Sequence, residues 1–204
     1  MKILVLILVS YLLGAVPNGY IFVQGIRDLD IRKYGSGNVG ATNVARLLGF
    51  KFGIIVAALD ILKGYLAVTF AGWLFSEAAL PLVLAGLLVV LGHSFSIFLN
   101  FSGGKGVATT IGVILRLYPW GVLLMLIVWL VVTVITRYVS LGSMLGAISL
   151  PVLFFLTGKS MTFVLFGLFI ALFIPYTHRE NIRRLMEGEE NKLGETVSPG
   201  KGER

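Results

Sequence analysis

The chain of 204 residues contains no cysteine, two histidines and few charged residues. Without cysteine, disulfides, thiolate metal sites and cysteine nucleophiles are excluded. With two histidines metal catalysis is improbable, so we expect no metal and no cofactor. Charged residues make up only 13% of the chain, whereas 57% of the residues are hydrophobic and the mean hydropathy is +0.93. A soluble domain carries about 25% charged residues, so the expected solvent of this chain is a lipid bilayer.

Apolar residues form seven runs, separated by short polar or glycine-rich breaks. The runs cover Ile3–Val23, Phe52–Phe75, Leu82–Phe101, Val107–Leu117, Pro119–Thr136, Leu141–Leu156 and Met161–Tyr176. At about 20 residues per membrane helix, the chain has room for at most seven or eight spans and for no separate soluble domain. The pattern predicts an all-α, polytopic integral membrane protein with about seven transmembrane helices. We expect residues 1–194 to form one transmembrane domain and 195–204 to form a polar tail.

The fourth run, Val107–Leu117, is too short to cross a bilayer as a plain helix. At about 1.5 Å per residue it extends roughly 16 Å, against a hydrocarbon core of about 30 Å. The run must therefore be half-buried or be entered through irregular backbone, which survives at that depth only where it lines a cavity. This run is the first indication of a site.

The formal net charge of +7 is compatible with nucleic acid, anionic lipid or an anionic substrate, and its location decides among them. With seven spans and the C-terminus inside, thirteen of the 17 Lys and Arg residues fall on the inner side. Lys2, Arg116 and Lys159 fall on the outer side, and Lys63 lies within a run. The positive-inside rule then places the N-terminus outside and the C-terminus in the cytoplasm. This location favours membrane lipids and phosphate-bearing substrates as partners and argues against nucleic acid.

The first cytoplasmic segment, Lys33 to Arg46, is rich in glycine and short polar side chains. The polar side chains are those of Ser36, Asn38, Thr42 and Asn43. Glycines let backbone N–H groups and short donors converge on an oxyanion, and Arg46 would add a positive charge. The alternative interpretation is a flexible loop of small residues.

The second segment carries Gly103, Gly104, Lys105 and Gly106 directly before the short fourth run. A glycine-rich turn that leads into a helix presents N–H groups, a helix dipole and a lysine to one point, as phosphate sites do. It is not a Walker A motif, because Gly106 stands where that motif requires Ser or Thr. The alternative is that the glycines pack helices and the lysine extends to the membrane surface.

Three further features each have a structural and a functional interpretation. Asp60 and Lys63 lie three residues apart on one helical face, where they would neutralise each other within the membrane. His93, at the cytoplasmic end of a run, is either a packing residue or a catalyst. The segment from His178 to Leu185 is either a basic anchor against anionic lipid or part of the site, since an anchor needs neither the histidine nor Asn181.

Together these segments resemble the bacterial membrane-integral, acyl-phosphate-dependent glycerol-3-phosphate acyltransferases. The resemblance covers nearly the whole chain and is carried by three motifs, at residues 35–43, 92–109 and 178–182. It implies a seven-span enzyme that moves an acyl group from acyl phosphate to the 1-hydroxyl of sn-glycerol 3-phosphate. The products would be lysophosphatidate and inorganic phosphate. Acyl-CoA-dependent acyltransferases instead use His followed five positions later by Asp, and here those positions hold Phe98 and Arg183.

The resemblance also implies roles for individual residues. The glycerol phosphate is expected to bind Arg46, Lys105, Ser143, His178 and Asn181. The acyl-phosphate head is expected to lie among Ser36, Asn38, Thr42, Asn43 and the N–H groups from Gly103 through Gly104 to Gly106. His93, Lys105, Ser36 and Asn181 are the expected catalytic residues. Either His93 or a phosphate oxygen of the substrate would be the general base.

The family further implies a multi-pass protein of the bacterial cytoplasmic membrane, with its site facing the cytoplasm. Its acyl phosphate would come from a phosphate acyltransferase that acts on acyl carrier protein. A function of a different class is a small transporter for a phosphorylated metabolite, because broken helices and a lysine within the membrane also suit transport. Only a faint internal similarity supports it, since residues 40–44 resemble 107–111 and both stretches lie on one side of the membrane.

Overall fold

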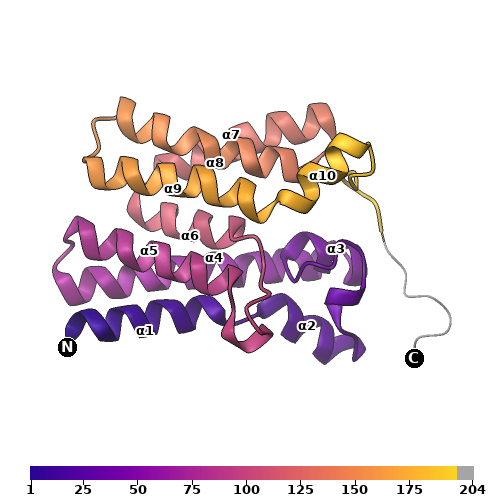
Figure 1. The fold of residues 1–204 in the computed structure, drawn as a ribbon, viewed down its shortest axis with the longest axis horizontal. Helices are drawn as coiled ribbons and strands as arrows, with labels where there is room; N and C mark the ends of the chain where they lie inside the picture. Colours follow the sequence, from indigo (N-terminus) through magenta and orange to yellow (C-terminus); the bar gives the residue numbers. More distant parts are fainter. Residues whose placement is uncertain (197–204) are drawn as a thin grey trace.

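The computed structural model describes residues 1–196, and every regular element in them is helical (Figure 1). The α-helices are α1 (Lys2–Ala15), α2 (Asn18–Arg27), α3 (Ala41–Leu48), α4 (Phe50–Phe75), α5 (Ala79–Ser94), α6 (Val107–Leu117), α7 (Pro119–Thr136), α8 (Val139–Leu156), α9 (Met161–Thr177) and α10 (Arg179–Glu187). Short 3₁₀ turns, η1 (Ile31–Lys33) and η2 (Ile97–Leu99), lie in the connections. The predicted all-α class is confirmed. Most of the predicted tail, residues 197–204, lies outside the described residues.

Each predicted apolar run contains a helix, but not every helix can span a membrane alone. The candidate spans, long and apolar enough to cross, are Lys2–Arg27, Phe50–Phe75, Ala79–Leu99, Pro119–Thr136 and Val139–Leu156. Helices α9 and α10 make a sixth if they are counted together across a bend of 57°. Helix α6 has only 11 residues, as the length of its run predicted. The described chain therefore has five or six candidate spans and one short apolar helix, in agreement with the expected set of about seven transmembrane helices that includes a short one.

The predicted first run forms two helices, because Pro17 interrupts it between α1 and α2. Proline has no N–H group to continue the helical ladder, so carbonyls at the end of α1 need other partners. The Lys63 ammonium on α4 donates to the carbonyls of Gly14 and Val16, at 2.8 and 2.9 Å. It also lies 3.0 Å from the Asp60 carboxylate, in the ion pair that the sequence predicted. The Asp60–Lys63 pair therefore also stabilises the break between α1 and α2, because Lys63 binds the carbonyls that are exposed there.

Short helix α6 lies between two groups of helices (Figure 1). Helices α1, α4 and α5 pack on one side of it, and α7, α8 and α9 pack together on the other. A Cβ at Gly64 would overlap the carbonyl of Thr109, and one at Gly112 would overlap the carbonyl of Ile61. Glycine at both positions therefore lets α4 and α6 approach closely, as small residues do between membrane helices.

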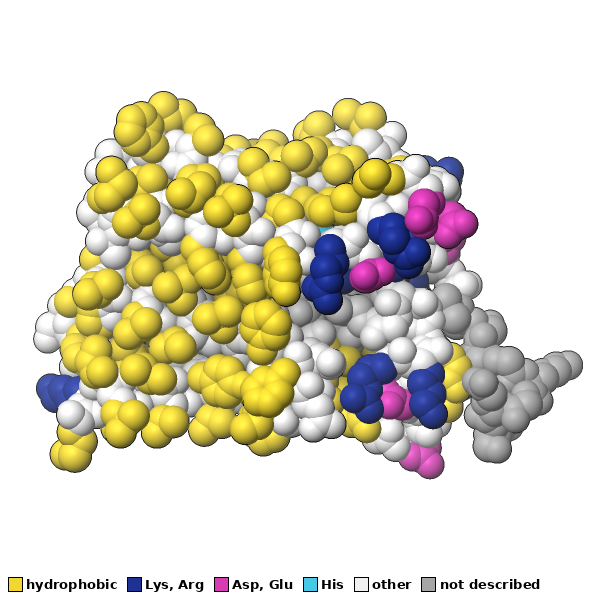
Figure 2. Space-filling view, in the orientation of Figure 1, with side chains coloured by type: hydrophobic (Ala, Val, Ile, Leu, Met, Phe, Trp, Pro, Cys, Tyr) yellow, Lys and Arg dark blue, Asp and Glu magenta, His cyan; other side chains and the backbone are white. Residues whose placement is uncertain are grey.

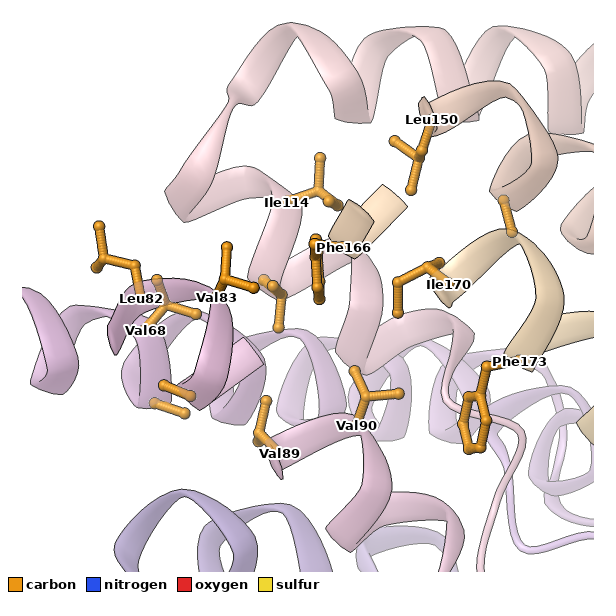
Figure 3. Close-up of a cluster of buried hydrophobic side chains, with 14 of the residues drawn as sticks. Val68, Leu82, Val83, Val89, Val90, Ile114, Leu150, Phe166, Ile170 and Phe173 are labelled. Carbon is orange, nitrogen blue, oxygen red and sulfur yellow. The ribbon is translucent and has the colours of Figure 1, made fainter. Parts of the chain in front are cut away.

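The apolar core lies around the far half of α6 (Figure 3). Ile114 of α6 is fully buried in one cluster with Leu150 of α8, Phe166 and Ile170 of α9, and Val90 of α5. Helix association within lipid depends on such close packing, because the lipid tails are as apolar as the side chains. The core holds α6 at the centre of the bundle and so sets where the first turn of α6 lies.

Charged side chains are concentrated at one end of the molecule, where α2, α3 and α10 lie, and apolar side chains cover much of the remaining surface in this view (Figure 2). At the opposite end Arg116 pairs with Glu77, and the Lys159 ammonium lies 4.3 Å from the ring centre of Tyr118. The basic residues that the positive-inside assignment separates thus lie at opposite ends. The charged end is where the predicted site residues meet.

Candidate active site

A cavity of about 260 Å³ opens at the charged end, between α3, the start of α6, the start of α8 and the α9–α10 bend. The predicted site residues that line it are Ser36, Asn38, Thr42, Asn43, Arg46, His93, Lys105, Gly106, Ser143, His178 and Asn181. Gly103 and Gly104 do not line it. The helices therefore bring together side chains from every motif on which the resemblance rests.

Asn43 shapes the first glycine-rich segment from within. Its amide nitrogen donates to the carbonyls of Tyr34 and Asn38, both at 2.9 Å, and its amide oxygen accepts the N–H of Ser36 at 3.1 Å. The side chain of Asn43 is buried, so it is occupied in holding the loop and is not a free donor. Asn43 therefore ties three parts of this loop of small residues together, and its contact with substrate stays a prediction.

Arg46 follows on α3 and lines the cavity. Among the described residues its guanidinium makes no hydrogen bond or ion pair, and burial lowers its pKa. A guanidinium nevertheless stays charged at neutral pH, because its ordinary pKa is above about 12. Arg46 therefore supplies a positive charge that is available to an anion.

The second glycine-rich turn folds back onto the end of α5. The N–H of Gly103 donates to the carbonyl of Ser94 and that of Gly104 to the carbonyl of His93, both at 3.0 Å. These two N–H groups are therefore already paired with α5, and the prediction that they bind an oxyanion gains no support from the structure. The turn packs so closely that a Cβ at Gly104 would lie 2.8 Å from Cε1 of His93.

The free N–H groups of this segment are instead those of the first turn of α6. No side chain caps this helix, and the first N–H groups of a helix have no partner within it. Gly106, with φ of +84°, and the next residues, Val107 and Ala108, line the cavity. The positive end of the helix dipole thus points into the cavity, as phosphate sites require.

Lys105 begins a chain of hydrogen bonds between separate elements. Its ammonium donates to the amide oxygen of Asn181 on α10, at 2.5 Å. The amide nitrogen of Asn181 donates to Glu190 at 2.6 Å, and Glu190 also accepts from Ser140 at 2.7 Å and from Arg184 at 2.8 Å. Burial lowers the pKa of Lys105 to about 8. Burial alone would raise the pKa of Glu190, but its hydrogen bonds outweigh burial and lower it.

Sequence reasoning missed Glu190, Ser140 and Arg184 as part of this arrangement. Glu190 lies beyond the end of α10 and is buried, since the chain folds back over the cavity. In the sequence it is one of several acidic residues in a polar stretch, and nothing distinguishes it from Glu187 or Glu189. Glu190 can be identified as a cavity residue only from the structure, in which the chain folds back over the cavity after α10.

The two histidines are both buried but differ in their contacts. Nδ1 of His178, at the α9–α10 bend, lies 2.7 Å from the carbonyl of Ile174, so this nitrogen carries the proton. Nδ1 of His93 lies 3.7 Å from the Asp60 carboxylate, and its Nε2 faces Gly104. Both rings line the cavity, but the ring nitrogens of His93 face Asp60 and the glycine turn.

Two further openings adjoin the cavity. An apolar groove of about 170 Å³ lies between α6, α7 and α8 and shares Val107, Ile111, Trp129 and Ser143 with the cavity. A polar bowl of about 440 Å³ lies on the other side of the glycine turn, where Gly103 and Gly104 line it. A cation-rich cavity is therefore joined to an apolar groove. Across residues 1–196 we find no group of three or more His, Cys, Asp and Glu side chains that could hold a metal ion.

The fold and the cavity define a class, namely membrane-integral helical proteins with an anion site joined to an apolar groove. The family model described as glycerol-3-phosphate acyltransferase matches residues 4–188. The chain is 43% identical over 188 residues to the glycerol-3-phosphate acyltransferase of Thermoanaerobacter sp. (strain X514), covering 92% of this chain and 94% of the relative. It is 45% identical over 187 residues to that of Carboxydothermus hydrogenoformans, covering 92% and 94%.

Two crystal structures of PlsY (YgiH), an integral membrane glycerol 3-phosphate acyltransferase, have the same fold. The glycerol 3-phosphate form gives a TM-score of 0.89 and the lysophosphatidic acid form one of 0.87, each with 40% identity over 95% of this chain and 96% of that chain. The chain therefore belongs to the glycerol-3-phosphate acyltransferase family. It is a multi-pass integral membrane enzyme, as the resemblance predicted.

Proposed function

We propose that the chain transfers an acyl group from an acyl phosphate to the 1-hydroxyl of sn-glycerol 3-phosphate, yielding lysophosphatidate and inorganic phosphate. The observation that carries this proposal is the junction of the cation-rich cavity with the apolar groove. Lysophosphatidate has one phosphate and one fatty chain, which match these two compartments in chemistry. The related PlsY structures are of glycerol 3-phosphate and lysophosphatidic acid forms.

An acyl phosphate suits the cavity because the cavity offers positive charge, and a donor with so good a leaving group needs no covalent intermediate. The chain has no cysteine, and neither histidine is followed by Asp five positions later. The hydroxyl oxygen would attack the acyl carbon, the bond from that carbon to the phosphate oxygen would break, and phosphate would leave with the electron pair. Phosphate leaves readily, so positioning and charge stabilisation supply most of the catalysis.

The glycerol phosphate is assigned to Arg46, Lys105, Ser143, His178 and Asn181. All of them line the cavity, and the two cations are within one enclosure. A phosphate dianion would take the ammonium hydrogen bond that Lys105 now gives to Asn181. Charge-assisted bonds of this kind are roughly twice as strong as neutral ones.

The head of the acyl phosphate is assigned to Ser36, Asn38 and Thr42, together with the free N–H groups at the start of α6. These groups face the same cavity from α3, its preceding loop and α6. The dipole of α6 favours the negative charge that builds up on the departing phosphate. The apolar groove beginning at Val107 and Ser143 would take the first part of the acyl chain.

The proton of the attacking hydroxyl is assigned to a phosphate oxygen of the substrate. A phosphate monoester has its second pKa near about 6, so its dianion accepts a proton near neutral pH. His93 is the competing base, and its position between Asp60 and Gly104 favours a packing role. We expect His93→Gln to keep turnover near that of the wild type while Lys105→Ala abolishes it. A loss of kcat in His93→Gln with an unchanged melting temperature would make the histidine the base.

The enzyme is placed in the bacterial cytoplasmic membrane, with the charged end in the cytoplasm and anionic lipid headgroups around it. Residues 1–194 are taken as one transmembrane domain, and a phosphate acyltransferase as the source of its donor. Because the chain has no cysteine, single cysteines can report sidedness. In right-side-out vesicles a membrane-impermeant maleimide should label Glu77→Cys and not Lys51→Cys. The reverse pattern would refute the orientation.

The donor is tested with purified protein in detergent. Acyl phosphate and radiolabelled glycerol 3-phosphate should give lysophosphatidate and an equal amount of phosphate. The matched acyl-CoA and acyl carrier protein thioesters should give none. Turnover with a thioester and with no acyl phosphate would refute the proposed donor.

A further inference from the structure

The apolar groove is short and runs along one turn of its helices. Its wall on α7 extends from Trp129 back to Met125, and its wall on α6 extends from Val107 to Ile111. Four residues of α-helix rise about 6 Å, so only the first few carbons of a fatty chain fit alongside these walls. A longer chain must continue beyond the groove.

The groove does not continue between α7 and α8, because these helices are in close contact. A Cβ at Gly146 would lie 3.1 Å from the carbonyl of Met125, and one at Gly142 would lie 2.8 Å from the carbonyl of Trp129. No space for a chain of methylene groups remains at such distances. The chain cannot enter the interior of the α7–α8 pair.

The groove instead opens toward the membrane. Leu126, one of its lining residues, is 46% exposed, and Leu123 and Leu130 on the same helix are also exposed. These leucines belong to an apolar candidate span, so the solvent that they face is lipid. At the other wall Val107 and Ile111 of α6 line the groove together with Ser143 and Gly146 of α8, and the two helices share the apolar core farther along, at Ile114 and Leu150. The methylene groups beyond the groove would therefore lie in lipid.

We propose that this enzyme selects its acyl donor by the first few carbons next to the carbonyl and not by the length of the chain. The proposal rests on the proposed function. A closed pocket discriminates about 10- to 200-fold for one methylene group, since the group leaves water or is excluded. Here the distal methylene groups lie in lipid both before and after the donor binds. The number of distal methylene groups therefore contributes nothing to the difference in kcat/KM between donors.

The test is a competition among donors in one mixed micelle, so that all donors meet the enzyme at the same surface concentration. Dodecanoyl, tetradecanoyl, hexadecanoyl and octadecanoyl phosphate are mixed in equal amounts, and the lysophosphatidates are quantified by mass spectrometry. We expect product ratios within about 3-fold, far below the discrimination of a closed pocket. A hexadecanoyl phosphate with a methyl branch next to the carbonyl should be disfavoured by about 10-fold or more, and one branched at the far end should not.

A steep optimum, with about 10-fold or more between neighbouring chain lengths, would overturn the proposal. Equal use of both branched donors would also overturn it, because the groove would then not sense the proximal carbons. Failure of every acyl phosphate would refute the proposed donor and this inference with it. Turnover with a steep length dependence would refute this inference alone.

A pair of variants on α7 tests the position of the groove. Leu126→Trp enlarges a lining residue, whereas Leu123→Trp makes the same change three residues earlier at a lipid-exposed position outside the groove. We expect Leu126→Trp to lower kcat/KM by about the same factor for every donor in the mixture, and Leu123→Trp to leave it unchanged. A loss in Leu126→Trp that grows with chain length would overturn the proposal, as would no loss with any donor.

Discussion

Replacing Lys105 with methionine removes the ammonium group that links the glycine-rich turn to α10. The ammonium donates to Asn181, and Asn181 donates in turn to Glu190. Methionine keeps the length of the side chain and its apolar contacts but carries no charge. Glu190 keeps its bonds from Ser140 and Arg184, so no unpaired carboxylate results.

The size of the effect follows from what the ammonium does in each state. Without substrate it makes one hydrogen bond to an amide, worth about 1.5–3 kcal/mol for a charged donor, and the cost of its burial offsets much of this gain, so the free energy of unfolding should change little. In the reaction it would stabilise phosphate charge within a partly enclosed cavity. Removing one such donor costs about 2.7–4 kcal/mol, so kcat/KM for glycerol 3-phosphate should fall by about 10²–10³.

The assay measures initial rates of lysophosphatidate formation by purified protein at saturating acyl phosphate. Thermal unfolding of each variant shows whether it is folded. Lys51→Met is the matched control, because Lys51 is exposed on the first turn of α4 and lies outside the cavity. If Lys105→Met retained kcat/KM within about 5-fold of the wild type, the ammonium would not stabilise the reacting phosphate, and the assignment would fail.

Three further predictions concern pH, backbone approach and the buried ion pair. Burial brings the pKa of Lys105 to about 8, so its ammonium is present below that pH and lost above it. The KM for glycerol 3-phosphate should therefore rise above pH 8, and a flat KM from pH 7 to 9.5 would contradict this. Gly104→Ala should lower activity, because its Cβ would overlap the imidazole of His93; wild-type kcat and melting temperature would show that the turn is not tightly packed. Lys63→Met should lower the free energy of unfolding by about 3–5 kcal/mol by leaving the buried Asp60 carboxylate without its cation, with only neutral hydrogen-bond donors such as Asn18 beside it. Adding Asp60→Asn should recover part of that loss, and an additive loss in denaturation curves would refute the coupling.

Much of the architecture was predictable because a bilayer imposes strong rules on a sequence. Apolar runs of about 20 residues mark spans, since every backbone group within lipid must be satisfied inside a helix. The same rule identified Val107–Leu117 as too short, and the structure confirms a helix of 11 residues there. The prediction of about seven membrane helices, some of them short, agrees with five or six candidate spans and the short α6, whereas only the structure shows that α9 bends into α10.

The site was predictable as a set of motifs but not as a set of contacts. Glycine-rich segments near Asn38 and Lys105 indicated phosphate binding, and the two segments meet at one cavity. Composition could not show that the N–H groups of Gly103 and Gly104 are used by carbonyls of α5. Nor could it show that Asn43 holds its own loop, because the same amide serves substrate or backbone equally well.

The membrane environment explains why the sequence predicts the fold class and the position of the charge but not the contacts within the site. The amount and order of apolar residues depend on the membrane, so the sequence shows a helical membrane protein with its positive charge on one side. Hydrogen-bond partners depend on which segments meet, and these segments are far apart in the chain. Glu190 becomes part of the cavity only because the chain returns over α8 after α10. The apolar groove likewise exists because residues of α6, α7 and α8 that are separated in the chain line one space, while close contact at Gly64 and Gly112 holds α6 against α4.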